Sequence, residues 1–136
     1  MQNSAEISHI LGVDFGEAKI GLAKADSETK IAFAYGTLDN DRALIDKLGD
    51  IFVKEAIETI VIGKPKESEK FSSLNISKFA DEIGDFFPMV RVEFEDEAFT
   101  TKMAEDRIKE TGKKNIKDLD NQEAARIILQ SWLDRQ

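Results

Sequence analysis

Short apolar runs alternate with longer amphipathic stretches along the chain. Near the N-terminus, three runs have the length of strands, and turn-forming residues such as Asp26-Ser27-Glu28-Thr29 separate them. They predict an antiparallel meander of three strands. The predicted strands are Ile7–Asp14, Ile20–Ala25 and Lys30–Gly36.

After the meander, apolar residues recur at helical spacing, which predicts helices. Two further predicted strands lie between these helices. Thr59–Ile62 is continuously apolar, as is typical of a strand covered on both faces. Pro88 ends the second helix, because the residue before a proline is disfavoured in a helix. The predicted helices are Asp41–Glu55, Leu74–Phe86, Thr100–Thr111 and Asp120–Leu133, and the predicted later strands are Thr59–Ile62 and Met89–Phe94.

This order of elements, β-β-β-α-β-α-β-α-α, predicts an α/β domain. We expect a mixed five-stranded sheet, with three antiparallel strands followed by two parallel ones, and helices on both faces. No repeat or linker interrupts the 136 residues, so a single domain over residues 1–136 is expected, with residues 1–6 flexible.

The amino-acid composition excludes or disfavours several kinds of catalytic and metal site. The chain has no cysteine and one histidine, His9, which excludes thiolate metal sites and argues against a His-rich zinc site or a Ser-His-Asp triad. Neither a membrane span nor a signal peptide is present, so we expect a cytoplasmic protein without a membrane partner. The net charge of −8 argues mildly against non-specific nucleic-acid binding, although basic residues can gather on one face.

Asp14 is the first candidate functional residue. It follows the apolar run that begins at Ile10, and Gly16 and Gly21 come soon after it. A carboxylate fixed at a strand end can hold a hard cation such as Mg²⁺, but an Asp in this setting can equally be a turn former. Gly16 permits a tight turn, and Gly21 permits the close approach of a phosphate or another backbone. The spacing alone leaves both interpretations of Asp14 open.

Further acids follow later strands. Parallel strands present their carboxyl ends at one edge, which would bring Asp14, Lys64 and the Asp96-Glu97 pair together. The start of the last helix, at Asp120 and Asn121, can add an oxygen. Such an all-oxygen set suits Mg²⁺ or Mn²⁺, and two ions about 3.5–4 Å apart can drive phosphodiester hydrolysis.

Each of these residues also has a structural interpretation. Asp96 and Glu97 can precede a helix, where negative charge is favourable. Thr100, Thr101 or Asp120 can be ordinary N-caps, and Lys64 can be a solvated loop lysine. The acids at two strand ends, taken together, favour the metal site.

The motifs together resemble the YqgF/RuvX family of RNase H-like proteins, described as Holliday junction resolvases and pre-16S rRNA nucleases. The resemblance extends from about Ile10 to Leu133. It implies an RNase H-like fold and a divalent-metal nuclease active on RNA or branched DNA. It also implies catalytic or metal-binding roles for Asp14 and Glu97, with Asp96 beside them. The matching motifs are Gly12-Val13-Asp14-Phe15-Gly16, Lys19-Ile20-Gly21, Ile62-Gly63-Lys64-Pro65, Asp96-Glu97 with Thr100-Thr101, and Ala124-Ala125 with Ile128-Leu129.

Two departures from the family pattern predict weakened activity. Ala98 stands where the family usually has an arginine, and Asn121 stands where the last acid is expected, with Asp120 one place earlier. Either Asp120 serves instead, or the third acid is lost. We therefore expect Asp14, Glu97 and Asp120 to be catalytic. The expected metal ligands are Asp14, Asp96, Glu97, Asp120 and Asn121, and the expected substrate-binding residues are Gly16, Lys19, Lys64, Thr100, Thr101, Lys113 and Lys114.

Two other functions compete with a metal-dependent nuclease. One is a catalytically weak module on the same fold that binds nucleic acid or protein, which Asn121, Ala98 and the acidic balance favour. The other is a phosphate-binding half of an ATPase, which ranks last because it needs a second similar domain. We expect a monomer or a homodimer.

Overall fold

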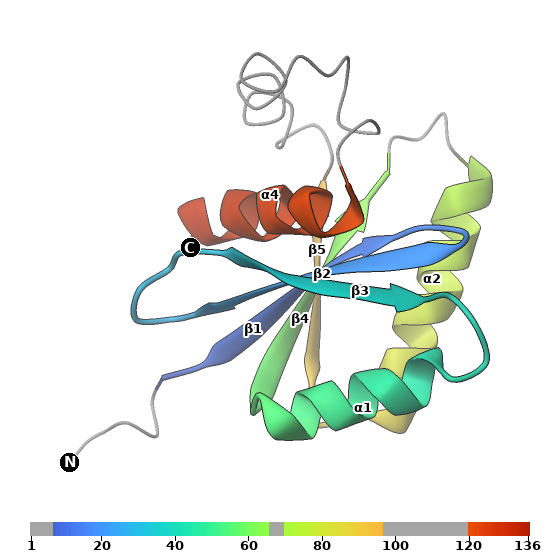
Figure 1. Ribbon diagram of the computed structural model, residues 1–136, viewed down its shortest axis with the longest axis horizontal. Helices are drawn as coiled ribbons and strands as arrows, with labels where there is room; N and C mark the ends of the chain where they lie inside the picture. The colour runs from blue at the N-terminus through green and yellow to red at the C-terminus, as the bar shows by residue number, and fades with distance from the viewer. Residues whose placement is uncertain (1–6, 66–69, 97–119) are drawn as a thin grey trace.

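The five strands form a single sheet in the order β3-β2-β1-β4-β5 (Figure 1). The computed structural model describes residues 7–65, 70–96 and 120–136, so residues 1–6 and the predicted helix Thr100–Thr111 lie outside the described residues. The strands are β1 His9–Phe15, β2 Lys19–Asp26, β3 Phe33–Asp39, β4 Ile57–Lys64 and β5 Arg91–Asp96, and the helices are α1 Leu44–Lys54, α2 Lys70–Phe86 and α4 Asn121–Asp134.

The pairing of the strands confirms the predicted mixed sheet. Strand β2 runs antiparallel to both β1 and β3, whereas β1, β4 and β5 are parallel to one another. The carboxyl ends of β1, β4 and β5 therefore meet at the same edge of the sheet, which is the usual place for a functional site in an α/β fold.

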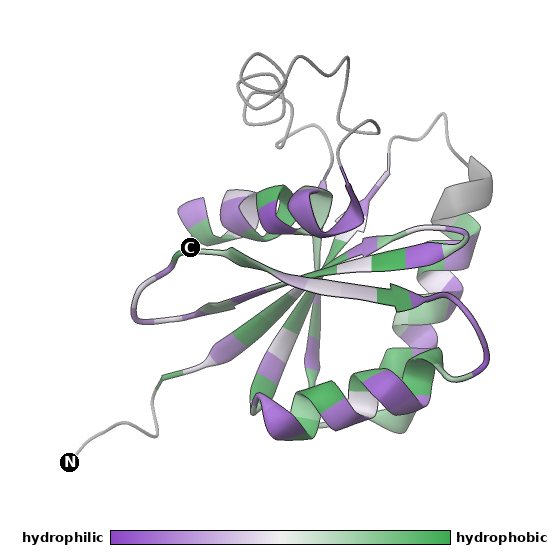
Figure 2. Ribbon diagram, in the orientation of Figure 1, coloured by the Kyte–Doolittle hydropathy of each residue, from purple (hydrophilic) through white to green (hydrophobic). Residues whose placement is uncertain are grey.

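Helices cover both faces of the sheet, as predicted. Helices α1 and α2 pack on one face and α4 packs on the other (Figure 1). Alternate residues of β1 serve the two cores, with Leu11 and Val13 on the α1–α2 side and Ile10 on the α4 side. Figure 2 shows hydrophobic residues along the central strands between these helix layers.

Helix α4 lies unusually close to the sheet because glycines face it. A Cβ atom at Gly21 on β2 would lie 1.9 Å from the backbone oxygen of Asn121. A Cβ atom at Gly12 on β1 would lie 2.6 Å from the Cβ of Leu129. The sequence left open whether Gly21 admits a phosphate or another backbone, and the structure places the backbone of α4 there.

The third strand begins later than its alternation predicts. The expected strand Lys30–Gly36 is wrong at its start, because β3 begins at Phe33. The Asp26 carboxylate accepts hydrogen bonds from the backbone N–H of Thr29 and Glu28, and Lys30 has a positive φ of 55°. The expected turn over Asp26–Thr29 is present, and it extends to Lys30, which the apolar pattern had assigned to the strand.

Other boundaries also differ from the expected ones. Helix α2 begins at Lys70 rather than Leu74, and β4 extends the expected Thr59–Ile62 at both ends. The first helix was expected from Asp41 but begins at Leu44, because the Asp41 carboxylate accepts the backbone N–H of Ala43 ahead of the helix. The fifth strand was expected from Met89 but begins at Arg91, because the backbone N–H of Val90 bonds in a turn. None of these shifts changes the order of the elements.

Candidate functional site

Asp14 lies near the carboxyl end of β1, the central strand of the sheet. It pairs directly with Gly21 across to β2, and its side chain is half-buried. Side chains alternate between the faces of a strand, so Asp14 shares the α4 face with Gly12. The buried run before it, from Ile10 to Val13, holds the carboxylate in place.

The start of α4 stands beside Asp14. The backbone of Asn121 packs against Gly21, the cross-strand partner of Asp14. Asp120 is the N-cap of the helix, and its Oδ1 accepts a hydrogen bond from the backbone N–H of Glu123 at 2.8 Å. The structural interpretation of Asp120 as a cap is therefore confirmed. Only Oδ1 of Asp120 makes this cap hydrogen bond, and Oδ2 takes no part in it.

Three polar residues at the ends of β4 and β5 do not all lie on the same face of the sheet as Asp14. Lys64 and Asp96 are paired in register and are both exposed. Asp96 follows Glu95, so the alternation places it on the face opposite to Asp14. Glu95 itself faces α4 and is 0 % exposed. The structure thus brings the start of α4 to Asp14, and it turns Asp96 away from them.

Glu95 is a residue that the sequence patterns missed. Its carboxylate accepts a hydrogen bond from Ser131 of α4 at 2.5 Å and forms an ion pair with Arg135, the C-cap residue of that helix. The sequence shows only an acid before the Asp96-Glu97 pair and an arginine near the C-terminus. Neither has a periodicity or a spacing that would have linked them.

The turn between β1 and β2 carries two predicted substrate-binding residues. The N–H of Gly16 donates to the Lys19 carbonyl at 3.1 Å, and the Asn40 side chain donates to the Gly16 carbonyl at 2.8 Å. Lys19 is exposed and forms an ion pair with Asp39 at 2.5 Å. That hydrogen bond, with the charge of Lys19, lowers the pKa of Asp39. Gly16 therefore makes the predicted tight turn.

The remaining predicted site residues, Glu97, Thr100, Thr101, Lys113 and Lys114, lie outside the described residues. Within the described ranges no group of three His, Cys, Asp or Glu side chains forms a metal-binding cluster. Asp14 nevertheless lies near the end of β1 beside the start of α4, where Asp120 is the N-cap, and hard oxygen donors are the type that Mg²⁺ prefers. The described residues thus fit part of a divalent-metal site.

The arrangement of the sheet, with helices on both faces and an acid near the end of the central strand, defines an RNase H-like α/β fold. Two solved structures share it over nearly the whole chain. RuvC from T. thermophilus in complex with Holliday junction substrate has a TM-score of 0.61 at 12% identity, covering 94% of both chains. Fowlpox virus resolvase with Holliday junction DNA has a TM-score of 0.58 at 15% identity, covering 93% of this chain and 97% of that one.

Sequence comparison identifies the family. The model of the RuvX family, described as Holliday junction resolvase, matches residues 8–135, and the chain belongs to this family. A relative from Sulfurihydrogenibium is 33% identical, covering 95% of this chain and 92% of its own length. One from Flavobacterium johnsoniae is 35% identical, covering 91% and 94%. Both carry the name "Putative pre-16S rRNA nuclease".

Among the described residues, no helix is long and apolar enough to cross a membrane.

Proposed function

We propose that this protein is a divalent-metal-dependent nuclease that hydrolyses phosphodiester bonds of structured RNA or branched DNA. The observation that carries the proposal is the contact between Gly21 and Asn121, which places the start of α4 beside Asp14. Membership of the RuvX family, and relatives named for pre-16S rRNA, support a nucleic-acid substrate. The family's description and the rRNA name leave branched DNA and RNA as the two substrates to test.

Asp14 and Asp120 are the described residues that would hold the metal. Asp14 offers a carboxylate from a rigid strand, and Asp120 offers its Oδ2 while Oδ1 caps α4. Asn121 can add a neutral amide oxygen, which is a poorer ligand than a carboxylate. When bound, Mg²⁺ or Mn²⁺ would activate the attacking water and stabilise the leaving oxygen. Glu97, which follows β5 directly, is the proposed acid from that strand. Asp96 is no longer proposed as a ligand, because it lies on the face of the sheet opposite to Asp14.

Substrate phosphates need positive groups around this edge. We assign that role to Lys19 and Lys64, which are exposed at the start of β2 and the end of β4. Gly16 keeps the intervening turn tight, so a nucleic-acid backbone can pass close to it. Further contacts to the substrate phosphates are proposed for four residues outside the described ranges: Thr100, Thr101, Lys113 and Lys114.

The first test removes the central carboxylate. Asp14→Asn is isosteric, so it should abolish Mg²⁺- or Mn²⁺-dependent cleavage while the thermal unfolding curve changes little. Asp85→Asn is the matched control, because Asp85 is an exposed acid of α2. Cleavage is measured on a four-way DNA junction and on a structured rRNA precursor fragment. Unchanged cleavage by Asp14→Asn would refute the proposed role.

A second test separates capping from metal binding at the start of α4. Asparagine is as good an N-cap as aspartate, so Asp120→Asn keeps the cap and removes only the charge. If Asp120 is a ligand, this variant binds Mn²⁺ more weakly in calorimetry at an unchanged melting temperature. If Asn121 occupies the ligand position instead, Asn121→Asp strengthens binding and Asp120→Asn has no effect.

The same titration decides between the nuclease and the alternative function. Ala98 and Asn121 favour a catalytically weak module that binds nucleic acid or protein on this fold. A wild-type protein that binds the junction or the RNA, but neither responds to metal nor cleaves, would establish that alternative and refute the nuclease.

A further inference from the structure

Glu95 lies in the same row of the sheet as Asp14. Val13 on β1 pairs with Ile62 on β4, and Gly63 on β4 pairs with Glu95 on β5. One residue beyond the Val13–Ile62 pair, Asp14, Gly63 and Glu95 therefore follow one another across three parallel strands. With neighbouring strands about 4.8 Å apart, the backbones of Asp14 and Glu95 are separated by about 10 Å.

The buried contacts of Glu95 hold the C-terminal end of α4 against β5. The side chain is 0 % exposed, and it receives the Ser131 hydroxyl at 2.5 Å and the Arg135 guanidinium. A buried carboxylate is tolerated only when it is paired and hydrogen-bonded, so these contacts must form together. Ser131 lies in the last turn of α4 and Arg135 is its C-cap residue, so the C-terminal end of the helix is tied to β5.

Several other contacts between α4 and the sheet are apolar or neutral. Leu129 and Leu133 of the helix, for example, pack in one core with Val61 of β4. Glycines face the helix at Gly12 and Gly21, and a Cβ atom at Gly63 would meet only the mobile end of the Ile128 side chain, at 2.6 Å. Contacts of this kind permit close packing but have no direction. Gln130 makes two neutral hydrogen bonds to the segment before β3: its Oε1 accepts from the backbone N–H of Ala32, and its Nε2 donates to the backbone carbonyl of Lys30. Glu95 adds a charged, directional contact at the other side of the sheet.

We propose that Glu95 is a positioning residue of the metal site. Through Arg135 and Ser131 it fixes α4 over the sheet, and the helix in turn holds Asp120 and Asn121 at Asp14. This inference rests on the proposed nuclease function for its effect on metal binding, while its effect on the position of α4 stands independently of that function.

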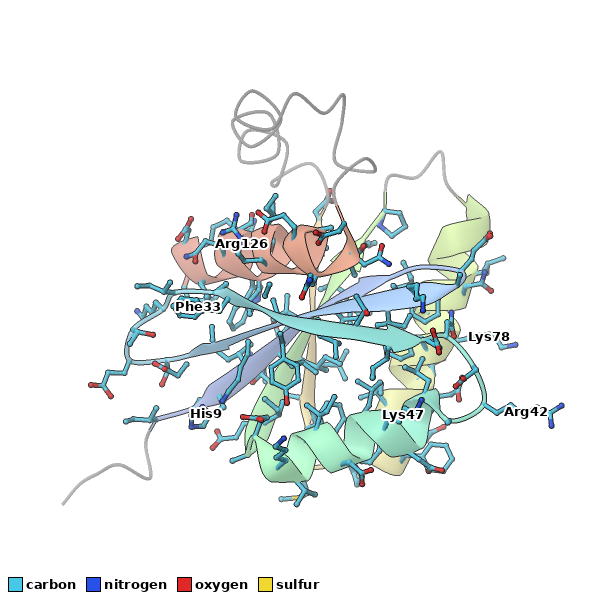
Figure 3. All side chains as sticks on the ribbon, in the orientation of Figure 1. His9, Phe33, Arg42, Lys47, Lys78 and Arg126 are labelled. Carbon is cyan, nitrogen blue, oxygen red and sulfur yellow. The ribbon has the colours of Figure 1, made fainter. Side chains whose placement is uncertain are left out.

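The chain contains a matched pair of arginines for the test. Arg135 pairs with Glu95 on the sheet. Arg126, which Figure 3 labels on α4, pairs with Glu123 of the same helix at 2.7 Å. The side chains of Arg135 and Arg126 are 40% and 30% exposed. Arg135→Met and Arg126→Met therefore each remove one ion pair at this helix, but only Arg135→Met removes a contact with β5, where the hydrogen bond from Ser131 to Glu95 remains.

Two measurements read the result at a temperature where every variant is folded. Hydrogen exchange reports on the first turn of α4, and calorimetry reports the affinity for Mn²⁺. Arg135→Met should raise exchange at residues 121–124 and weaken Mn²⁺ binding about tenfold, as is typical when a residue that orients metal ligands is lost. Arg126→Met should stay within about twofold of the wild type in affinity, on the same scale. Arg135→Lys should restore part of the loss, because it returns the charge.

The outcomes distinguish the two proposals. Equal exchange at the start of α4 in Arg135→Met and Arg126→Met overturns the positioning role of Glu95, as does altered exchange with unaltered Mn²⁺ affinity. A wild type without Mn²⁺ binding refutes the nuclease function, and exchange then decides alone whether Glu95 positions α4. If Arg135→Met does not fold, Ser131→Ala, which removes the neutral partner of Glu95, takes its place in both measurements.

Discussion

The contact between Gly21 and Asn121 predicts a severe penalty for a single methyl group. In Gly21→Ala the new Cβ would lie 1.9 Å from the Asn121 oxygen and 2.2 Å from its carbonyl carbon. Both atoms are backbone, so no side-chain rotation relieves the clash, and the start of α4 must move. Overpacking of a core typically costs about 1–3 kcal/mol, and a backbone clash belongs at the upper end of that range.

The other glycines below α4 give a graded series. In Gly12→Ala the methyl meets the Leu129 Cβ at 2.6 Å, which is fixed to the helix, so we expect a cost of about 2 kcal/mol. In Gly63→Ala it meets the Cδ1 of Ile128 at the same distance, and rotation of that side chain should hold the cost below about 1 kcal/mol.

Urea unfolding followed by circular dichroism measures the series. A loss of about 3 kcal/mol in Gly21→Ala corresponds to a melting temperature about 10 °C lower for a domain of this size. Gly84→Ala in α2 is the control, because nothing lies within 4 Å of its Cβ position, and alanine there should stabilise the helix by about 0.5–1 kcal/mol. Wild-type stability in Gly21→Ala, or a cost smaller than that of Gly63→Ala, would refute the proposed close seat of α4.

Two further predictions concern stability. Asp120→Ala should lower the free energy of unfolding by about 1 kcal/mol through loss of the cap bond to Glu123, whereas Asp120→Asn should not, and chemical denaturation measures both. Glu55 has a lowered pKa because of its hydrogen bonds from Lys24, foremost, and from Tyr35. A lowered folded-state pKa contributes stability that is present above the ordinary glutamate value of about 4.3 and is lost as the pH falls through the folded value. Glu55→Gln should therefore flatten the fall in melting temperature on acidification, and an unchanged pH profile would contradict the assignment.

The fold could be predicted because its signals are local. Apolar runs and helical spacing gave the order of the elements, and that order requires the mixed sheet that the structure contains. Element ends were less predictable, because side-chain hydrogen bonds set them. The Asp26 turn delays β3 and the Asp41 bond to Ala43 delays α1, although apolar spacing alone would start both elements earlier.

The candidate site could be predicted only in part. Asp14 and the start of the last helix could be proposed as parts of the site from sequence alone, because an isolated acid or a helix cap next to an apolar run is a local pattern. Glu95 was missed because its importance depends on where α4 crosses β5, and no local pattern encodes that crossing. The opposite facing of Glu95 and Asp96 likewise follows from strand register, which fixes the face of each acid only once the strand bounds are known.

Helix α4 follows all five strands in the sequence, yet it covers the apolar face formed by Ile10, Ala23 and Val61. A growing chain therefore makes the whole sheet before it makes the helix that shields this face from water. Until residues 121–134 have left the ribosome, Asp14 has no helix start beside it. The order of synthesis delays assembly of the site, and the exposed face in the meantime is a surface that a chaperone would recognise.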